Sequence, residues 1–279
     1  MALASLDAVV DGDDDFPPTI GQVLLSHRKF RGLTRLGLAR RTSLSAKLIE
    51  KIERNERPVS RDNLKILLEA LGIYALVGEE YFDLAFQPDT VRERLLASAD
   101  TVPEAHDLAL LDALDCPAAL MAPASSDLIA TNASFDRALP GAMESTNLLK
   151  WLLFDSRARQ VLPEPYWTQE THLLVGGLHC RWPTLVTRSR LNLLLDDLME
   201  SHEFARFWST PISANKVLSP ILGLRDLSTG ETIEHFRGTS EPEFPYKRRW
   251  RLYTISPVRA PHQRYCTNRN TRRTTRIEA

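Results

Sequence analysis

The residues with the clearest chemical potential form a short charged cluster at positions 46–54. Lys47, Lys51 and Arg54 follow one another at spacings of four and three residues, with Glu50 among them. In an α-helix, side chains at these spacings share one face. Such a face offers several hydrogen-bond donors to an acceptor-rich surface. The alternative is that these are solvated helix charges, with Glu50 and Lys51 paired only to their neighbours.

The charge of the chain is unevenly distributed, although the net charge is only −1 over 279 residues. Residues 1–18 carry five aspartates and no base, whereas residues 19–73 carry twelve Lys/Arg and five Asp/Glu. Residues 259–279 carry six arginines and one glutamate. A basic block inside a near-neutral chain indicates a polyanionic partner for that block.

Motifs for enzymatic chemistry are absent from the sequence. It contains no Gly-x-Ser-x-Gly elbow, no His-Glu-x-x-His zinc motif and no phosphate-binding glycine loop. His172, His179 and Cys180 are the nearest approach to a metal cluster, but their spacing fits no standard site. We therefore expect no enzymatic activity, no cofactor and no metal site.

Four short helices are predicted in the basic block. Thr19, Thr34, Ser45 and Ser60 can each cap a helix, and Gly32, Asn55 and Gly72 can end three of them. The predicted helices cover 20–31, 35–41, 46–54 and the residues from 61 to Gly72, and a further short helix is expected at 79–86. The small Ala39 would let the second helix approach the first, and Ile49 and Ile52 would hold the third against it. Ala46, Lys47, Glu50, Lys51 and Arg54 would then face outward.

This stretch resembles the Cro/CI-type (XRE family) helix-turn-helix of transcription regulators. The matching positions run from Leu33-Thr34 through Ala39, Leu44-Ser45, Ile49 and Ile52-Glu53-Arg54 to Arg57-Pro58, Leu64 and Leu71-Gly72. Three positions depart from the family: Ser43 and Asn55 stand where glycine is usual, and Arg35 stands where glutamine is usual. A left-handed backbone at Ser43 would cost about 1–2 kcal/mol.

The resemblance implies double-stranded operator DNA as the partner. Ala46, Lys47, Glu50 and Lys51 would face base edges in the major groove. Lys47 and Lys51 would donate to guanine, and Glu50 would accept from cytosine. Arg35, Arg54 and Asn55 would contact phosphates. The implied DNA-binding set is Arg35, Ser45, Ala46, Lys47, Glu50, Lys51, Arg54 and Asn55.

The sequence from His106 onward predicts an α+β domain. Short apolar runs at 118–121 and 128–130 alternate with helical stretches at 147–154 and 191–208, and 252–255 predicts a closing strand. Residues 231–247 look irregular, and Gly176-Gly177 suggests a break. The large aromatic side chains of this region could line a cavity or simply fill the core.

This second part resembles the MmyB-like ligand-binding domain, a PAS-like fold found behind Cro/CI-type domains. The segments that carry the resemblance are 111–120, 127–132, 147–159 and 201–208, and it covers roughly residues 90–258. It implies a small, apolar, fatty-acid-like ligand near Asn132, Asn147, Trp151, Phe154 and Trp208. The family's His-Pro hairpin is missing from 218–230, which leaves the far wall of such a pocket undefined.

The predicted fold class is an all-α helix-turn-helix DNA-binding domain followed by an α+β PAS-like domain. The expected organisation is a disordered acidic leader at 1–18, the DNA-binding domain at 19–86, a linker at 87–105, the PAS-like domain at 106–258 and a disordered Arg-rich tail at 259–279. Three widely spaced cysteines and the lack of a long apolar run indicate a cytoplasmic protein without a membrane span. We expect a homodimer made through the second domain.

Two functions remain open from the sequence. One is a ligand-responsive transcription regulator. The other is a DNA-binding regulator whose C-terminal domain only dimerises or docks a partner protein, without a small ligand.

Overall fold

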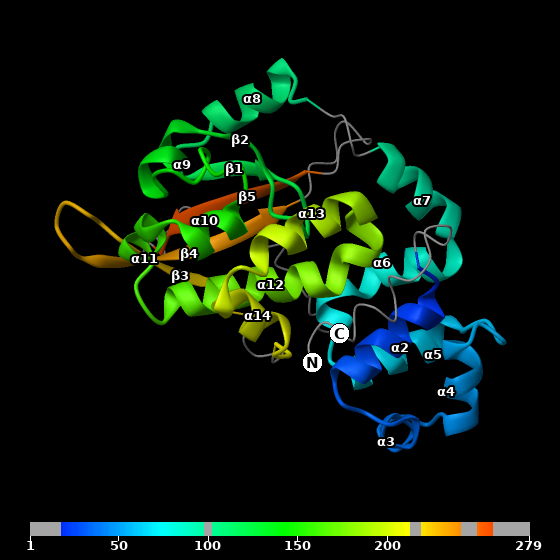
Figure 1. Cartoon of the computed structure of the whole chain (residues 1–279). Helices are drawn as coiled ribbons and strands as arrows, with labels where there is room; N and C mark the ends of the chain where they lie inside the picture. Colours follow the sequence, from blue (N-terminus) through cyan, green and yellow to red (C-terminus); the bar gives the residue numbers. More distant parts are fainter. Residues whose placement is uncertain (1–17, 98–101, 213–218, 241–249, 259–279) are drawn as a thin grey trace, which may run out of the picture.

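The computed structural model of the chain describes residues 18–97, 102–212, 219–240 and 250–258. An N-terminal group of helices packs beside a C-terminal part built of helices and a five-stranded antiparallel sheet (Figure 1). The expected leader (apart from Pro18) and the Arg-rich tail lie outside these residues. No helix in the described part of the chain has the length and apolarity needed to cross a bilayer.

The N-terminal part consists of short helices that begin where their caps predict. Thr19, Thr34, Ser45 and Ser60 each accept a backbone N–H three residues further on. The helices are α2 (Ile20–Phe30), α3 (Arg35–Ala39), α4 (Ala46–Glu53), α5 (Arg61–Ala70), α6 (Tyr74–Phe86) and α7 (Pro88–Ala97). Helix α6 begins five residues earlier than expected, and α7 lies in the segment expected to be a linker.

Three residues end helices in the left-handed conformation, as their types predict. The φ angles are 63° at Gly32, 57° at Asn55 and 67° at Gly72. Ser43 is not among the described residues of positive φ. The turn between α3 and α4 therefore takes a form that serine adopts without left-handed strain.

Helix α2 approaches the backbone of α4 closely at Gly21. A Cβ at this position would lie 2.3 Å from the carbonyl oxygen of Ile52 and 3.2 Å from that of Glu53. The missing side chain of Gly21 therefore allows α2 to lie against the end of α4. Ala39, which was predicted to provide the close approach, is half-buried at the end of α3.

We expect Gly21→Ala to destabilise the N-terminal helices by about 1–3 kcal/mol, because the clash is with backbone and α2 must move away from α4. Hydrogen exchange of the α2 and α4 amides measures the loss. Gly177→Ala is the matched control, since its Cβ would meet only Nη1 of Arg181, at 3.8 Å. Equal protection in both variants would show that the contact at Gly21 is not tight.

The C-terminal part alternates strands with helices. Its strands are β1 (Ala118–Met121), β2 (Leu128–Thr131), β3 (Ile221–Arg225), β4 (Thr232–Ser240) and β5 (Arg251–Pro257). Its helices are α8 (Ala105–Asp112), α9 (Ala133–Ala138), α10 (Leu148–Phe154), α11 (Ser156–Val161), α12 (Tyr166–Leu185), α13 (Arg188–Leu198) and α14 (His202–Trp208).

The sheet has the strand order β2-β1-β5-β4-β3, with every neighbouring pair antiparallel. Alternate residues of β1 point to opposite faces. Ala119 and Met121 join the main core, which contains residues of α10 to α14. Ala118 and Leu120 join a smaller core with Leu111 of α8 and Trp250. The sheet is therefore covered on both sides at this end (Figure 1).

Two expectations for the C-terminal part are wrong. Residues 232–240 form strand β4, not an irregular segment, and β4 pairs with both β3 and β5. Gly176-Gly177 does not break the chain, because both residues lie inside the 20-residue helix α12. This helix is buried along much of its length between the sheet and the N-terminal helices, so packing outweighs the weak helix propensity of glycine.

Helix α12 also joins the two parts of the chain. It packs against α6 and α7, and the buried Cys180 belongs to the core of the N-terminal helices. Figure 1 shows α12 passing from below the sheet to the side of α6. A shift of α12 in one part of the chain would therefore alter its packing in the other part.

Candidate functional site

The first candidate site is the outer face of α4. Ser45 caps the helix, and Ile49 and Ile52 are buried beneath it. Lys47, Lys51 and Arg54 are exposed, whereas Ala46 and Glu50 are half-buried. Helices α3 and α4 lie on the side of the helical group away from the sheet (Figure 1). The face predicted from the spacing is therefore present and uncovered by the described part of the chain.

The charges on this face are not equivalent. Glu50 lies 3.6 Å from Nη1 of Arg35 and 3.9 Å from Nη1 of Arg54. Glu50 therefore pairs with neighbours, as the alternative reading of these charges expected, whereas Lys47 and Lys51 form no ion pair within the described residues. The two lysines are therefore the cations on α4 whose donors remain available to another molecule.

Arg35 and Asn55 flank the face in different ways. Arg35 donates from Nε to Oε2 of the buried Glu53, at 2.8 Å, and its side chain is 37% exposed. Asn55 is exposed after the end of α4. Arg35 thus lies between two carboxylates, Glu53 at its Nε and Glu50 near its Nη1, and its half-exposed guanidinium is at the border of the face.

The second candidate site is a cavity of about 180 Å³ between α12 and the sheet. Its walls include Met121 and Ala124 near β1, Leu173, Leu174 and Gly177 on α12, and Arg237 and Tyr253 on the sheet. A dry cavity of about 150 Å³ can hold benzene. This space is therefore large enough for a small molecule. Its lining is mixed, because Leu173 and Leu174 are apolar whereas Glu170, Arg181, Arg237 and Arg251 are charged.

A buried polar network forms one wall of the cavity. Glu170 is 2% exposed, accepts a hydrogen bond from the Tyr253 hydroxyl at 3.1 Å and pairs with Arg237. Burial, together with the nearby Glu170 carboxylate, raises the pKa of Tyr253 well above its usual range. The tyrosine therefore stays protonated and keeps the network in one arrangement.

Two further arginines connect this cavity to the N-terminal helices. Arg181 and Arg251 both line it, and both approach Oε1 of Glu80, at 3.3 and 3.4 Å. Glu80 belongs to α6 of the N-terminal part. A molecule that binds these arginines would therefore change the contacts of α6.

The five residues expected near a ligand do not line this cavity. Asn132 and Asn147 cap α9 and α10, and their amides donate to nearby carbonyl groups. The Trp151 ring is fully buried, and its Nε1 donates to the carbonyl of Pro140. Phe154 is 49% exposed. Trp208 is buried against Phe204 and His179.

Sequence reasoning missed Glu80, Arg181 and Arg251. These residues lie on elements that are distant in the chain, and α12 was not expected as a helix. Spacing within the sequence carries no signal for such a contact.

A third group lies between the two parts of the chain. His179 and Cys180 on α12 are joined by His27 of α2 rather than by His172. His172 instead lies 2.9 Å, at Nε2, from the Thr210 carbonyl. Burial and nearby positive groups lower the pKa of His27 to about 3 and of His179 to about 4. Burial also raises the pKa of the Cys180 thiol to about 11.

A match to a known family lies in the centre of the chain. Residues 103–219 match the family model of the MmyB-like transcription regulator ligand binding domain. The match confirms the expected resemblance for this stretch, from α8 to just before β3. It associates the stretch with ligand binding in transcription regulators and not with an enzyme family. No curated protein matches the chain.

Proposed function

We propose that the protein is a sequence-specific DNA-binding transcription regulator whose C-terminal domain responds to a small ligand. The observation that carries the proposal is the exposed face of α4, on which Lys47 and Lys51 have no ion-pair partner among the described residues. The stretch that follows the N-terminal helices, residues 103–219, matches a ligand-binding domain of transcription regulators. In this proposal the N-terminal helices form a Cro/CI-type helix-turn-helix domain.

The DNA contacts follow from the position of each residue on this face. Helix α4 is the element that enters the major groove, with Lys47 and Lys51 at base edges. Both arginines approach Oε1 of Glu50, so Oε2 is the oxygen that accepts from cytosine. Ala46 also faces the base edges, Ser45 borders the groove, and Arg35, Arg54 and Asn55 contact the DNA phosphates.

The ligand we propose is a small apolar acid that occupies the cavity between α12 and the sheet. Leu173, Leu174 and Met121 offer an apolar wall to its hydrocarbon part. Arg181 and Arg251 offer donors to its carboxylate. The volume of about 180 Å³ favours a molecule of roughly six to ten carbons. The fatty-acid-like ligand inferred from the sequence is thereby narrowed to a short chain.

The response to the ligand rests on competition for the two arginines. A carboxylate bound between Arg181 and Arg251 competes with Glu80 for the same donors. Losing Glu80 weakens the hold of the C-terminal domain on α6 and changes the position of the DNA-binding helices. The ligand can act in this way only if it binds the two arrangements with unequal affinity.

A second function is favoured by the exposed apolar side chains near the β3–β4 hairpin. Leu227 is 55% exposed, and Ile233 and Phe236 are 48% and 45% exposed. Ile233 and Phe236 are three residues apart on β4 and so lie on opposite faces of the sheet, and either face suits a contact with a second copy or with another protein. In this alternative the C-terminal domain dimerises or docks a partner without binding a small ligand.

The test has two stages. Selection of bound sequences from random duplex DNA with the full-length protein yields the operator. If no sequence is enriched, the proposal of sequence-specific DNA binding is contradicted. DNA affinity is then measured with octanoate and with octanol. We expect octanoate, but not octanol, to change the affinity by about 5–150-fold.

Substitutions at Gly177 separate the ligand-responsive function from its alternative. A leucine here would fill the cavity, whereas alanine adds one methyl group with its nearest neighbour 3.8 Å away. We expect Gly177→Leu to bind the operator normally and ignore octanoate, and Gly177→Ala to respond like the wild type. Wild-type operator binding that is unaffected by octanoate would favour dimerisation or docking.

A further inference from the structure

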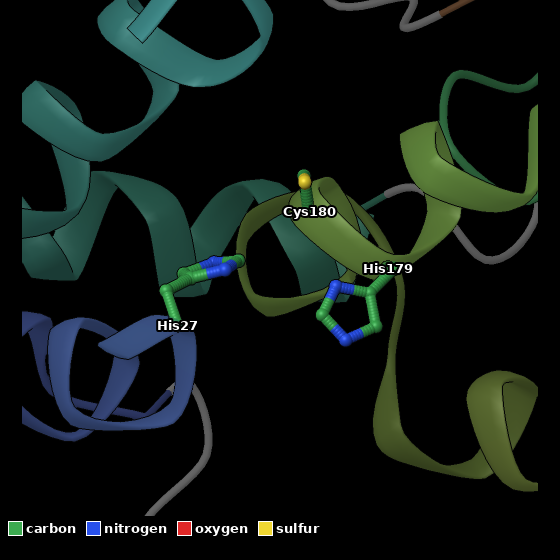
Figure 2. A group of neighbouring side chains, drawn as sticks. All are labelled: His27, His179 and Cys180. Atoms are coloured by element: carbon green, nitrogen blue, oxygen red, sulfur yellow. The ribbon is translucent and has the colours of Figure 1, made fainter. Parts of the chain in front are cut away.

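Three metal-binding side chains meet at the junction of the two parts of the chain. Figure 2 shows His27 on α2 approaching His179 and Cys180 on α12. One ligand atom from each residue lies within 4.8 Å of the other two. Neither half of the chain contains the set by itself, so the site exists only when α2 and α12 are packed together.

The hydrogen bonds of Tyr81 prepare His27 to act as a ligand. The Tyr81 hydroxyl donates its single hydrogen to the Cys180 carbonyl, at 2.5 Å. The same hydroxyl oxygen must therefore accept a hydrogen bond from Nε2 of His27, which lies 2.7 Å away. His27 consequently carries its proton on Nε2 and has its lone pair on Nδ1. Histidine ligands in proteins are commonly oriented by a hydrogen bond of this kind from the second ring nitrogen.

The available space fits one ion. Because the three ligand atoms lie within 4.8 Å of one another, some point lies within about 2.8 Å of each, while zinc bonds to nitrogen and sulfur are about 2.0–2.3 Å. A cavity of about 20 Å³ lies here, and all three residues line it. That volume exceeds the minimum for one water molecule. Small side-chain movements would therefore complete three bonds and leave a fourth position for water.

The donor set and its surroundings select the kind of metal. Two imidazoles and one thiolate suit zinc and not the hard cations calcium and magnesium, which prefer oxygen. Arg31 also lines the cavity. The positive charge of Arg31 opposes a bare cation, but the bound thiolate offsets part of this repulsion.

We propose that His27, His179 and Cys180 bind one zinc ion that links α2 of the N-terminal helices to α12 of the C-terminal part. The ion is a structural clamp across the junction. It adds to the contact already made there by Phe30, whose ring lies 4.0 Å from that of His179, centroid to centroid. This inference is independent of the identity of the DNA and of the small ligand.

The experiment is a zinc titration of tag-free, metal-depleted full-length protein against a chromophoric chelator. We expect one zinc per chain and a higher melting temperature when zinc is present. We expect His27→Gln, His179→Gln and Cys180→Ala each to weaken binding at least about 100-fold, because even second-shell changes cost 10–100-fold. Gln at position 27 can still donate to Tyr81, so that variant tests ligation separately from the hydrogen bond.

The matched control is the variant Cys116→Ser/Cys266→Ser/His202→Gln, which removes two other thiols and an exposed imidazole. It is expected to bind zinc like the wild type. Cobalt loading provides a second measurement, since a thiolate-to-cobalt charge-transfer band should appear in the wild type and vanish in Cys180→Ala. The proposal is overturned if the wild type binds no stoichiometric zinc, or if His179→Gln binds it as tightly as the wild type.

Discussion

Operator binding should fall by roughly 30-fold to 10⁴-fold when Lys47 and Lys51 are replaced together by alanine, because each good base contact contributes about 1–3 kcal/mol. Both side chains are exposed on α4 and do not pack in the core beneath it. The fold should therefore survive the change. Binding to the selected operator and to a scrambled duplex, measured at the same salt concentration, gives the loss of specificity.

The matched control for this variant is Lys29→Ala/Arg92→Ala. It also removes two exposed positive charges, but from α2 and α7 instead of α4. Such a change should weaken binding to both duplexes equally and modestly, through the general charge effect. If the Lys47→Ala/Lys51→Ala variant retained the wild-type operator affinity, the assignment of α4 as the reading helix would be wrong.

The second large effect is expected in the fold itself, at Glu53. Its side chain is 2% exposed and receives Nε and Nη2 of Arg28 at 2.5 and 2.9 Å. Arg35 donates to the same carboxylate at 2.8 Å. One buried anion thus joins α2, α3 and α4.

Glu53→Gln should lower the stability of the N-terminal helices by about 3–5 kcal/mol, because Arg28 remains buried without its counter-charge. All five tryptophans lie at or beyond position 151, so tryptophan fluorescence does not report on this part of the chain. Hydrogen exchange of the α2 and α4 amides in the full-length protein reports it directly.

Glu56→Gln is the control for this prediction. Glu56 also pairs with an arginine, Arg54, at 2.8 Å, but its side chain is 46% exposed. Removing such a surface pair should cost less than about 1 kcal/mol. Similar protection in Glu53→Gln and Glu56→Gln would show that the buried network contributes little to stability.

The sequence by itself determined the features that depend on neighbouring residues. A cap acts over three residues, so Thr19, Thr34, Ser45 and Ser60 could be read as helix starts. A left-handed end depends on one residue type, which is why Gly32, Asn55 and Gly72 were predicted correctly. The face of α4 follows from helical periodicity. The strand at 118–121 follows from its apolar run, and the predicted strand at 252–255 lies within β5.

Long buried elements were harder to predict, because their sequence pattern is set by packing on several sides. Helix α12 has apolar, polar and glycine residues around its whole circumference. No single apolar stripe distinguishes it, and Gly176-Gly177 suggested a break. Strand β4 is exposed along most of its length and is held by pairing with β3 and β5.

Only the tertiary structure decided which distant side chains meet. Tyr81 and Cys180 are 99 residues apart, and Glu80 and Arg251 are 171 residues apart. Gly21 matters because of where the backbone of Ile52 passes, which no pattern around position 21 encodes. The arginine pair at Glu80 and the histidine–cysteine cluster arise from packing across the junction, and the cavity arises from the packing of α12 against the sheet. Side-chain chemistry is fixed by the sequence, but proximity across many intervening residues is fixed by the fold.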